Sequence, residues 1–476
     1  MQPVIMKFGG TSVEDASAFA NVARIVGRLA KREGVQRPLP VVVVSAMSGF
    51  TDALLASAQE ALNGNVDSAS ELLEKHLARH HEVVDALVET ERATLGALLE
   101  QSRIEIAGLL NAVAAEPDAH SRQKFYFDAV VSFGERLSAN LLAAVLRAGG
   151  IAAQCVDARK CIITDDNHGS AAPLIAQTFS ATRGALSGVI EASTVPVLGG
   201  FIGSNTVGNT TTLGRGGSDY TAALIGAALA AGEIQIWTDV SGVLTADPRV
   251  VDNARSIPRL SFAEAAELAY FGAKVLHPKT LQPAVERDIP VRICNSRAPE
   301  SESTVVGSET EKSPDTVKSI AHKMGVTTVQ VTSARMLGAY GFLRALFEVF
   351  DRHRTEVDVV TTSEVSVSLS LDDTSALPAI VKELEEFGSV SVEGRRAIVC
   401  VVGEGLRSTP GIAARIFSTI SDINVSLISQ GASRINLTFA VEEARAAETV
   451  RRLHAEFFET ENESASRAEG QAQAVT

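Results

Sequence analysis

The sequence has few cysteines, no excess of positive charge and no long hydrophobic run. Its four cysteines, Cys155, Cys161, Cys294 and Cys400, form no CxxC pair or other framework, which favours reduced thiols in a cytoplasm. The formal net charge of -14 at pH 7 argues against a surface for nucleic acid or anionic membrane. The longest apolar run, residues 222–231, is too short and too rich in alanine to cross a bilayer. We expect no signal peptide, because the N-terminus begins a strand at once.

The length and composition are those of an ordinary soluble chain with several domains. The 476 residues correspond to roughly two to four domains, and the chain is 45% hydrophobic and 21% charged. Strand-like and helical segments alternate through residues 1–299, which predicts an α/β domain with a mostly parallel central sheet. Residues 52–119 show only helical patterns, and we expect about two or three helices there, on one side of the sheet. Buried strands are expected at residues 4–6, 41–45, 152–156, 195–198, 234–237 and 291–294.

The C-terminal part has a different pattern. Residues 300–318 are rich in Ser, Thr, Glu and Lys, and they predict a linker. Beyond them a β-α-β-β-α-β order occurs twice, which is typical of small α+β units of ferredoxin-like type. These units are predicted at residues 319–394 and 395–459, and the polar residues 460–476 are predicted to be disordered.

The first predicted strand leads into a turn, residues 7–13, with the sequence KFGGTSV. Gly9 and Gly10 carry no Cβ, so a ligand can approach the backbone N–H groups. Lys7 adds an ammonium, and the Thr–Ser pair that follows is expected to cap a helix beginning near residue 15. These groups together suit a phosphoryl group in transfer. A plain strand–turn–helix with an exposed lysine has the same local pattern.

A second glycine-rich turn, residues 214–220 (GRGGSDY), leads directly into an Ala/Leu helix. A helix N-terminus binds anions, and Arg215 adds a guanidinium that fits a carboxylate or a phosphate. Asp219 is an acid at a helix start, where acids usually serve as caps. Next to a phosphate site it has another use, in orienting a cation such as Lys7 or holding Mg²⁺, and phosphoryl transfer depends on such positioning.

A third group of residues follows the strand predicted at 234–237. Thr238 and Asp239 stand at its carboxyl end, where open parallel sheets bind ligands, although an ordinary strand exit has the same pattern. A turn predicted at residues 247–248 gives Arg249 access to a phosphate. Lys274 follows a predicted helix end and is a weaker candidate by itself.

Three more residues are candidates for binding a small polar substrate. Glu135 is expected to follow a strand and open a helix, either as a favourable charge for the helix dipole or as the partner of a substrate ammonium. Ser45 and Thr51 flank a small-residue turn, where both hydroxyls can donate to a carboxylate. No metal site is predicted, since His76 and His80 lack both the Glu of a zincin and a third ligand. The chain also contains no P-loop.

These turns, with FGAKVLHP at residues 271–278, resemble the signature motifs of the aspartate kinases. The resemblance extends to about residue 458. It implies an amino-acid-kinase three-layer α/β sandwich followed by two α+β ACT domains. It also implies transfer of the γ-phosphoryl group of ATP to the β-carboxylate of L-aspartate, giving 4-phospho-L-aspartate. This reaction is the entry step to lysine, threonine and methionine.

The resemblance also implies a role for each matching residue. Lys7 would neutralise the transferring phosphoryl group, and Asp219 would orient it or help with the proton and the metal, while ATP would bring its own Mg²⁺. Leu244 departs from the family, because many relatives have a Tyr there near the base of ATP. The residues that match the aspartate pocket are Ser45, Thr51, Glu135, Arg215 and Ser218, and those that match the nucleotide site are Lys7, Gly9, Gly10, Thr238, Asp239, Arg249 and Lys274.

The helical insertion resembles the lysine-sensitive, single-enzyme class, and a fused homoserine dehydrogenase is not expected. Residues 357–366 resemble the lysine-binding segment of that class. Asp358 and Glu364 suit an ε-ammonium, although edge-strand carboxylates that keep a sheet soluble have the same pattern. Inhibition by lysine is thus expected at Met336, Phe342, Val357, Asp358, Ser363 and Glu364.

We further expect a cytoplasmic homodimer or tetramer that assembles through the ACT units, without a nucleic-acid or membrane partner. Two alternatives stay open. One is another amino-acid kinase, acting on glutamate or an N-acetylated relative. The other is an amino-acid sensor with an inactive kinase domain. Glu135 favours a free amino group over an acetylated one, and the presence of Lys7, Arg215, Asp219 and Lys274 speaks against the sensor.

Overall fold

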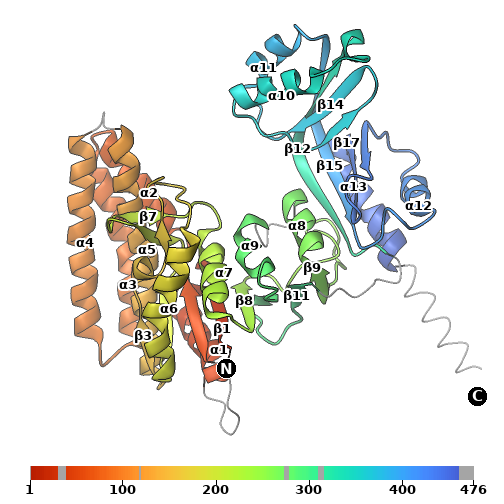
Figure 1. Cartoon of the computed structure of the whole chain (residues 1–476). Helices are drawn as coiled ribbons and strands as arrows, with labels where there is room; N and C mark the ends of the chain where they lie inside the picture. Colours follow the sequence, from red (N-terminus) through yellow and green to blue (C-terminus); the bar gives the residue numbers. More distant parts are fainter. Residues whose placement is uncertain (1, 31–38, 117–119, 273–277, 309–315, 460–476) are drawn as a thin grey trace, which may run out of the picture. The chain divides into compact units, whose positions relative to one another are not determined.

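The computed structural model describes residues 2–30, 39–116, 120–272, 278–308 and 316–459 (Figure 1). The chain divides into two compact units, each described separately below. The first unit comprises Met1–Val243, Pro258–Phe262 and Val275–Thr310. The second comprises Leu244–Ile257, Ala263–Lys274 and Glu311–Thr476. Two short segments that the sequence pattern groups with the α/β domain therefore cluster with the C-terminal unit.

An eight-stranded sheet organises the first unit, in the order β3-β5-β2-β1-β8-β10-β11-β9. Neighbouring strands are parallel except for the β10–β11 pair, so the predicted fold class is confirmed. Its strands are β1 (Val4–Phe8), β2 (Pro40–Val44), β3 (Ala153–Cys155), β5 (Val195–Gly199), β8 (Glu233–Thr238), β9 (Arg259–Ser261), β10 (Val291–Asn295) and β11 (Thr304–Gly307). A smaller sheet contains β4 (Ile163–Thr164), β6 (Ile202–Asn205) and β7 (Thr210–Thr212).

Side chains of β1 alternate between two helical layers, as a strand covered on both faces requires. Val4, Met6 and Phe8 belong to the core cluster that also contains side chains of α1 and α5. Ile5 faces the opposite layer, since a Cβ built on Gly226 of α7 would lie 3.5 Å from its Cγ1. The first unit is thus a three-layer sandwich, and its helices outside the insertion include α1 (Ala16–Ala30), α5 (His120–Ala148), α6 (Ile175–Glu191), α7 (Gly217–Leu229) and α9 (Pro278–Val285).

The predicted helical insertion consists of three helices that pack with α5 (Figure 1). They are α2 (Phe50–Leu62), α3 (Val66–Leu87) and α4 (Arg92–Ala115). Among the described residues one helix segment, Arg122–Ala148 of α5, is long and apolar enough to cross a membrane by length and composition alone. Its most apolar window is 83% buried inside the fold, as in the core helix of a packed domain.

One six-stranded antiparallel sheet organises the second unit, in the order β13-β14-β12-β15-β17-β16. The start of β12 pairs with the end of β15, and the end of β12 pairs with the start of β15. The two predicted α+β units therefore share both strands, which sequence patterns could not reveal because they locate strands without pairing them. The strands are β12 (Ser319–Thr332), β13 (Val360–Thr362), β14 (Ser366–Leu371), β15 (Ser389–Val402), β16 (Leu427–Gln430) and β17 (Asn436–Glu442), and the helices are α8 (Phe262–Phe271), α10 (Phe342–Arg352), α11 (Leu377–Leu384), α12 (Ile412–Thr419) and α13 (Glu443–His454).

Candidate active site

A cleft of about 660 Å³ lies where β1, β2 and β8 of the first unit end. Open parallel sheets bind ligands at this carboxyl edge. The cleft gathers residues that are distant in sequence but were predicted to act together. Its lining includes Lys7, Gly9, Gly10, Ser45, Thr51, Glu135, Arg215, Ser218, Asp219, Thr238 and Asp239.

The lining of the cleft includes a close ion pair between Lys7 and Asp219. Lys7 shares its face of β1 with Ile5, so its side chain points to the layer of α7. Asp219 lies in the first turn of α7, and its Oδ1 is 2.7 Å from Lys7 Nζ. The two side chains are only 12% and 14% exposed. The carboxylate therefore holds the ammonium in one place at the edge of the cleft.

The glycine-rich turn before α7 presents backbone N–H groups to the cleft. Gly216 precedes the helix with a φ of 74°, a left-handed conformation that favours glycine. The start of any α-helix leaves its first N–H groups without intrahelical acceptors, here including those of Ser218 and Asp219. Arg215 stands in the same turn with an exposed side chain. This combination can bind a carboxylate or a phosphate.

Glu135 contributes a buried carboxylate with one unused oxygen. The prediction that it opens a helix is wrong, because it lies in the middle of α5. Its Oε1 accepts a 3.3 Å hydrogen bond from the Ala46 N–H, and its Oε2 is buried without a hydrogen-bond partner. Burial raises the pKa of Glu135 to about 8, and the bond from Ala46 acts in the opposite direction. An unpaired buried carboxylate oxygen is suited to a cationic group of a ligand.

Close backbone packing at Gly199 brings the Glu135 carboxylate to the end of β5. A Cβ at Gly199 would lie 2.8 Å from Glu135 Cβ and 2.9 Å from its backbone oxygen. Any side chain at Gly199 would therefore push α5 away from the sheet. Gly200 likewise allows close packing against the glycine-rich turn at residues 214–220, since a Cβ at Gly200 would lie 2.7 Å from Ser218 Cα.

The turn after β1 differs from its prediction in one respect. Residues Gly10–Val13 form a short 3₁₀ helix, and Asp15 caps α1 by accepting a 2.9 Å bond from the Ala18 N–H. Ser12 does not cap the helix. Its buried hydroxyl donates to the Ser296 hydroxyl at 2.8 Å, which ties the turn after β1 to the loop after β10. Asp15 is the cap because it directly precedes α1, which begins at Ala16, whereas Ser12 lies in the 3₁₀ helix before it.

Two residues near the cleft were missed from the sequence. Arg79 of α3 donates to the backbone oxygen of Ser48 at 2.8 Å and to that of Glu14 at 2.6 Å. One guanidinium therefore joins the loops that follow β1 and β2. This role could not be predicted from the sequence, because every residue has a backbone oxygen. Phe201 lines the cleft with a φ of 65°. The Gly-Gly pair before it, at the end of a predicted strand, was a usable signal.

Two predicted nucleotide-site residues are not part of this cleft's described lining. Arg249 belongs to the second unit, where its exposed guanidinium lies 2.6 Å from Asp247. This pair holds the pKa of the Asp247 carboxyl below its ordinary value, mainly through the hydrogen bonds from Arg249. Lys274 lies outside the described residues.

The second unit contains the predicted effector segment, residues 357–366. The side chain of Asp358 is only 5% exposed, and its Oδ2 lies 3.2 Å from the ammonium of Lys323 on β12. Its Oδ1 accepts a hydrogen bond from the Tyr270 hydroxyl, and Lys323 also pairs with Asp372. Burial raises the pKa of Asp358, while the bond from Tyr270 and the charge of Lys323 act to lower it. The ammonium of Lys323 thus already pairs with the Asp358 carboxylate, which was predicted to bind the lysine effector.

The other predicted effector residues divide into an apolar and a polar group. Met336, Phe342 and Val357 pack against one hydrophobic cluster of the second unit. Ser363 and Glu364 are exposed in the turn between β13 and β14, where the Ser363 hydroxyl lies 2.7 Å from the Ser366 hydroxyl. The three apolar side chains therefore contact the same core cluster, whereas Ser363 and Glu364 face solvent.

The fold and the cleft together define a class of protein. The profile described as "Amino acid kinase family" matches residues 2–295, and an ACT domain profile matches residues 399–457. The chain belongs to the amino acid kinase family.

Within that family its relatives are aspartokinases, kinases that phosphorylate the side-chain carboxyl of aspartate. It is 39% identical to lysine-sensitive aspartokinase 3 of Escherichia coli (strain K12) over 468 residues, which cover 96% of this chain and 99% of that protein. The structure of E. coli aspartokinase III with aspartate and ADP (R-state) matches with a TM-score of 0.81 at 37% identity. The structure of that enzyme with lysine and aspartate (T-state) matches with a TM-score of 0.79 at 36% identity. Each match covers 96% of this chain and 100% of the solved chain.

Proposed function

We propose that the cleft of the first unit binds L-aspartate and ATP and transfers the γ-phosphoryl group to the β-carboxylate. The product is 4-phospho-L-aspartate, which enters the route to lysine, threonine and methionine. The observation that carries the proposal is the Lys7–Asp219 pair at 2.7 Å, in one cleft with Arg215 and Glu135. Phosphoryl transfer to a carboxylate requires positioning and charge neutralisation rather than a protein nucleophile.

The acceptor is held at both ends of its amino-acid group. Arg215 pairs with the α-carboxylate, and the free Oε2 of Glu135 receives the α-ammonium. Ser45, Thr51 and Ser218 supply hydroxyl donors around the acceptor. With both charged ends bound, the side-chain carboxylate is the group left to face ATP. An acetylated nitrogen carries no charge and would leave Glu135 without its partner.

The transferring group is neutralised by Lys7, which Asp219 keeps in place. Gly9, Gly10, Thr238 and Asp239 bind the phosphates of ATP, and Arg249 and Lys274 are assigned to the same nucleotide from their matching motifs. Mg²⁺ enters with the nucleotide. The carboxylates of the cleft fit such a shared ion, and the described residues contain no group of three His, Cys, Asp or Glu side chains suited to a resident one.

Lysine is proposed as the feedback effector, acting at residues 336, 342, 357, 358, 363 and 364 of the second unit. Support comes from the lysine-sensitive relative, from the shared core contacts of Met336, Phe342 and Val357, and from the shielded carboxylate of Asp358. We also propose that the second unit dimerises. The support is an exposed apolar surface, since Leu337 is 63% exposed and Tyr340 is fully exposed.

The test is an assay with ATP, Mg²⁺ and L-aspartate, in which hydroxylamine traps the acyl phosphate as a hydroxamate. We expect hydroxamate formation with L-aspartate and little with L-glutamate, N-acetyl-L-aspartate or N-acetyl-L-glutamate. Preference for an acetylated acceptor would assign another kinase activity. No product with any acceptor, together with lysine binding, would indicate a sensor.

A further inference from the structure

We propose that Asp128 is a positioning residue for the turn that carries Arg215. It acts through Thr212 and the loop at residues 168–171, and it never touches the substrate. This inference rests on the proposed function, in which Arg215 binds the α-carboxylate of aspartate. Nothing in the local sequence around Asp128 indicates such a role, because its partners are 40 or more residues away.

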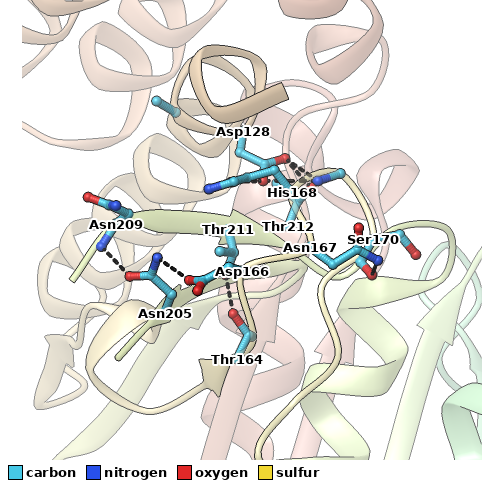
Figure 2. A network of polar contacts seen from close by, with 12 residues as sticks. Asp128, Thr164, Asp166, Asn167, His168, Ser170, Asn205, Asn209, Thr211 and Thr212 are labelled. Carbon is cyan, nitrogen blue, oxygen red and sulfur yellow. Dashed lines mark hydrogen bonds and ion pairs between the residues drawn. The ribbon is translucent and has the colours of Figure 1, made fainter. Parts of the chain in front are cut away.

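The buried carboxylate of Asp128 accepts hydrogen bonds from groups on two other segments of the chain (Figure 2). Asp128 is 2% exposed. Its Oδ1 accepts a 2.5 Å bond from the Thr212 hydroxyl, and its Oδ2 lies 2.8 Å from His168 Nδ1 and 3.0 Å from the Gly169 N–H. A buried carboxylate is stable only when such donors satisfy it, so it fixes the three groups relative to α5.

The three groups lie directly beside the turn that carries Arg215. Thr212 ends β7, two residues before Gly214. Gly214 has a φ of 74°, and a Cβ there would lie 3.4 Å from Ser170 Oγ and 3.5 Å from the Gly169 oxygen. The backbone oxygen of Thr212 also accepts a 2.8 Å bond from the Ala171 N–H. The loop at residues 168–171 thus supports the turn from one side, and Asp128 holds both.

One helix therefore positions both ends of the acceptor site. Asp128 precedes Glu135 on α5 by about two helical turns. Glu135 faces the ammonium of aspartate directly, and Asp128 fixes the turn whose guanidinium faces the carboxylate. Because α5 is largely buried and carries both carboxylates, one element positions the two binding groups of the acceptor site. The edge of the Phe125 ring packs on His168 at a centroid distance of 5.4 Å and restricts that ring as well.

The experiment compares Asp128→Asn with Asp166→Asn. Asparagine at residue 128 places an NH₂ group against one of the donors, so the turn loses a fixed support. We expect KM for aspartate to rise about five- to tenfold, with KM for ATP unchanged and kcat changed less than twofold. Asp166 is exposed two residues before this loop, and its carboxylate accepts a 2.7 Å bond from Asn205 Nδ2 rather than from Thr212 (Figure 2). The Asp166→Asn variant should have the same KM for aspartate as the wild type.

A double-variant cycle separates positioning from general stability. If Asp128 acts through Arg215, then Asp128→Asn in an Arg215→Ala background should add less than about twofold to KM for aspartate. Fully multiplicative effects would overturn the proposal. His168→Asn, which keeps a donor near Nδ1, should restore most of the affinity that His168→Ala loses. Should Asp128→Asn fail to fold, Thr212→Val tests the same link, and an unchanged KM for aspartate would then refute it.

The failure of this inference is distinct from failure of the proposed function. A wild-type chain that does not phosphorylate aspartate contradicts the function itself. An active wild type whose Asp128→Asn variant keeps its KM for aspartate contradicts only the positioning role.

Discussion

Each of the two units holds a lysine ammonium beside an aspartate carboxylate, but the pairs differ in what they leave free. In the cleft, Lys7 meets Asp219 at 2.7 Å, and the separate acid Glu135 keeps an unpaired oxygen. In the second unit, Lys323 pairs with both Asp358 and Asp372, and Tyr270 bonds the remaining oxygen of Asp358. One site is prepared for an added cation, whereas in the other an internal cation is already present.

This difference determines how each site responds to a ligand ammonium. At Glu135 a ligand ammonium meets a carboxylate oxygen without a hydrogen-bond partner, so it displaces no internal cation. At Asp358 a lysine effector must replace an ammonium of the same kind, and only the difference between the two pairings remains. Substrate binding in the cleft is therefore expected to depend strongly on its acid, while effector binding depends on the balance around Lys323.

The largest effect is expected when the cleft pair loses its ammonium. Lys7→Ala should lower kcat by about a thousandfold, because no other group replaces the charge beside the transferring phosphoryl group. The stopped assay with hydroxylamine trapping measures the loss, and circular dichroism checks the fold. Lys160 is exposed and does not line the cleft, so Lys160→Ala serves as the control. Near-normal turnover in Lys7→Ala would remove Lys7 from the chemistry.

A second prediction tests whether Glu135 is the open acid. Its pKa is raised from 4.5 to about 8, so the free cleft holds it mostly protonated at pH 7. Only the ionised form pairs with the ammonium of aspartate. Affinity for aspartate should therefore rise about tenfold per pH unit until about pH 8 and then level off. Profiles of KM for aspartate between about pH 6 and about pH 9 measure this rise.

The matching variant should remove the pH dependence and the affinity together. Glu135→Gln keeps the shape but has no charge to gain, so its profile should be flat, with KM for aspartate about thirtyfold higher at pH 8. Glu105→Gln, at an exposed position of α4, should keep the wild-type profile. A pH slope that persists in Glu135→Gln would assign the titration to another group.

The contrast also shows which parts of the molecule were predictable. Lys7, Arg215 and Asp219 were found because each stands in a short turn whose chemistry is local in sequence. Glu135 was found as a residue but placed at a helix start, because the pattern before it suggested a strand and α5 in fact begins at His120. Short motifs thus identified the candidate site residues, whereas the ends of the helices and strands around them could not be predicted from the sequence.

What escaped prediction depends on pairing across long separations. Lys323 lies 35 residues from Asp358, on a strand whose pairing with β15 spans both predicted units. Arg79 acts on backbone oxygens, which every residue has. Neither kind of contact produces a recognisable pattern of residue types in the sequence. Both could therefore be identified only from the folded structure. The paired state of Asp358 is therefore a finding of the structure, and the effector role of the segment remains a proposal.

A third prediction concerns the competition between Lys323 and a lysine effector for the Asp358 carboxylate. Lys323→Met removes the internal competitor, so the concentration of lysine that halves activity should fall about three- to tenfold. Asp372→Asn should act in the opposite direction, because Lys323 then has Asp358 as its main partner. Aspartate saturation curves at several lysine concentrations measure both. Lys382→Met, exposed on α11, is the control. Shifts of the same sign in Lys323→Met and Asp372→Asn would contradict competition at Asp358.

The smallest effect is expected at Arg79, which supports the cleft from behind. Arg79→Gln should raise KM for aspartate about three- to fivefold, because the backbone oxygens of Ser48 and Glu14 lose their shared donor. Arg79→Lys should fall between this variant and the wild type, since one ammonium does not span two carbonyl groups as a guanidinium does. Steady-state kinetics with each substrate varied in turn measures the change.

A matched arginine in the same helical bundle makes this last test specific. Arg92 also donates to a backbone oxygen, that of Asp85 at 3.0 Å, but it touches neither loop of the cleft. Arg92→Gln should therefore leave KM for aspartate unchanged, even where it lowers thermal stability as much as Arg79→Gln does. Equal KM changes in the two variants would mean that the bundle affects the cleft only through overall stability. A change in KM for aspartate that is confined to Arg79→Gln would mean that the helical insertion positions the loops of the cleft for binding aspartate.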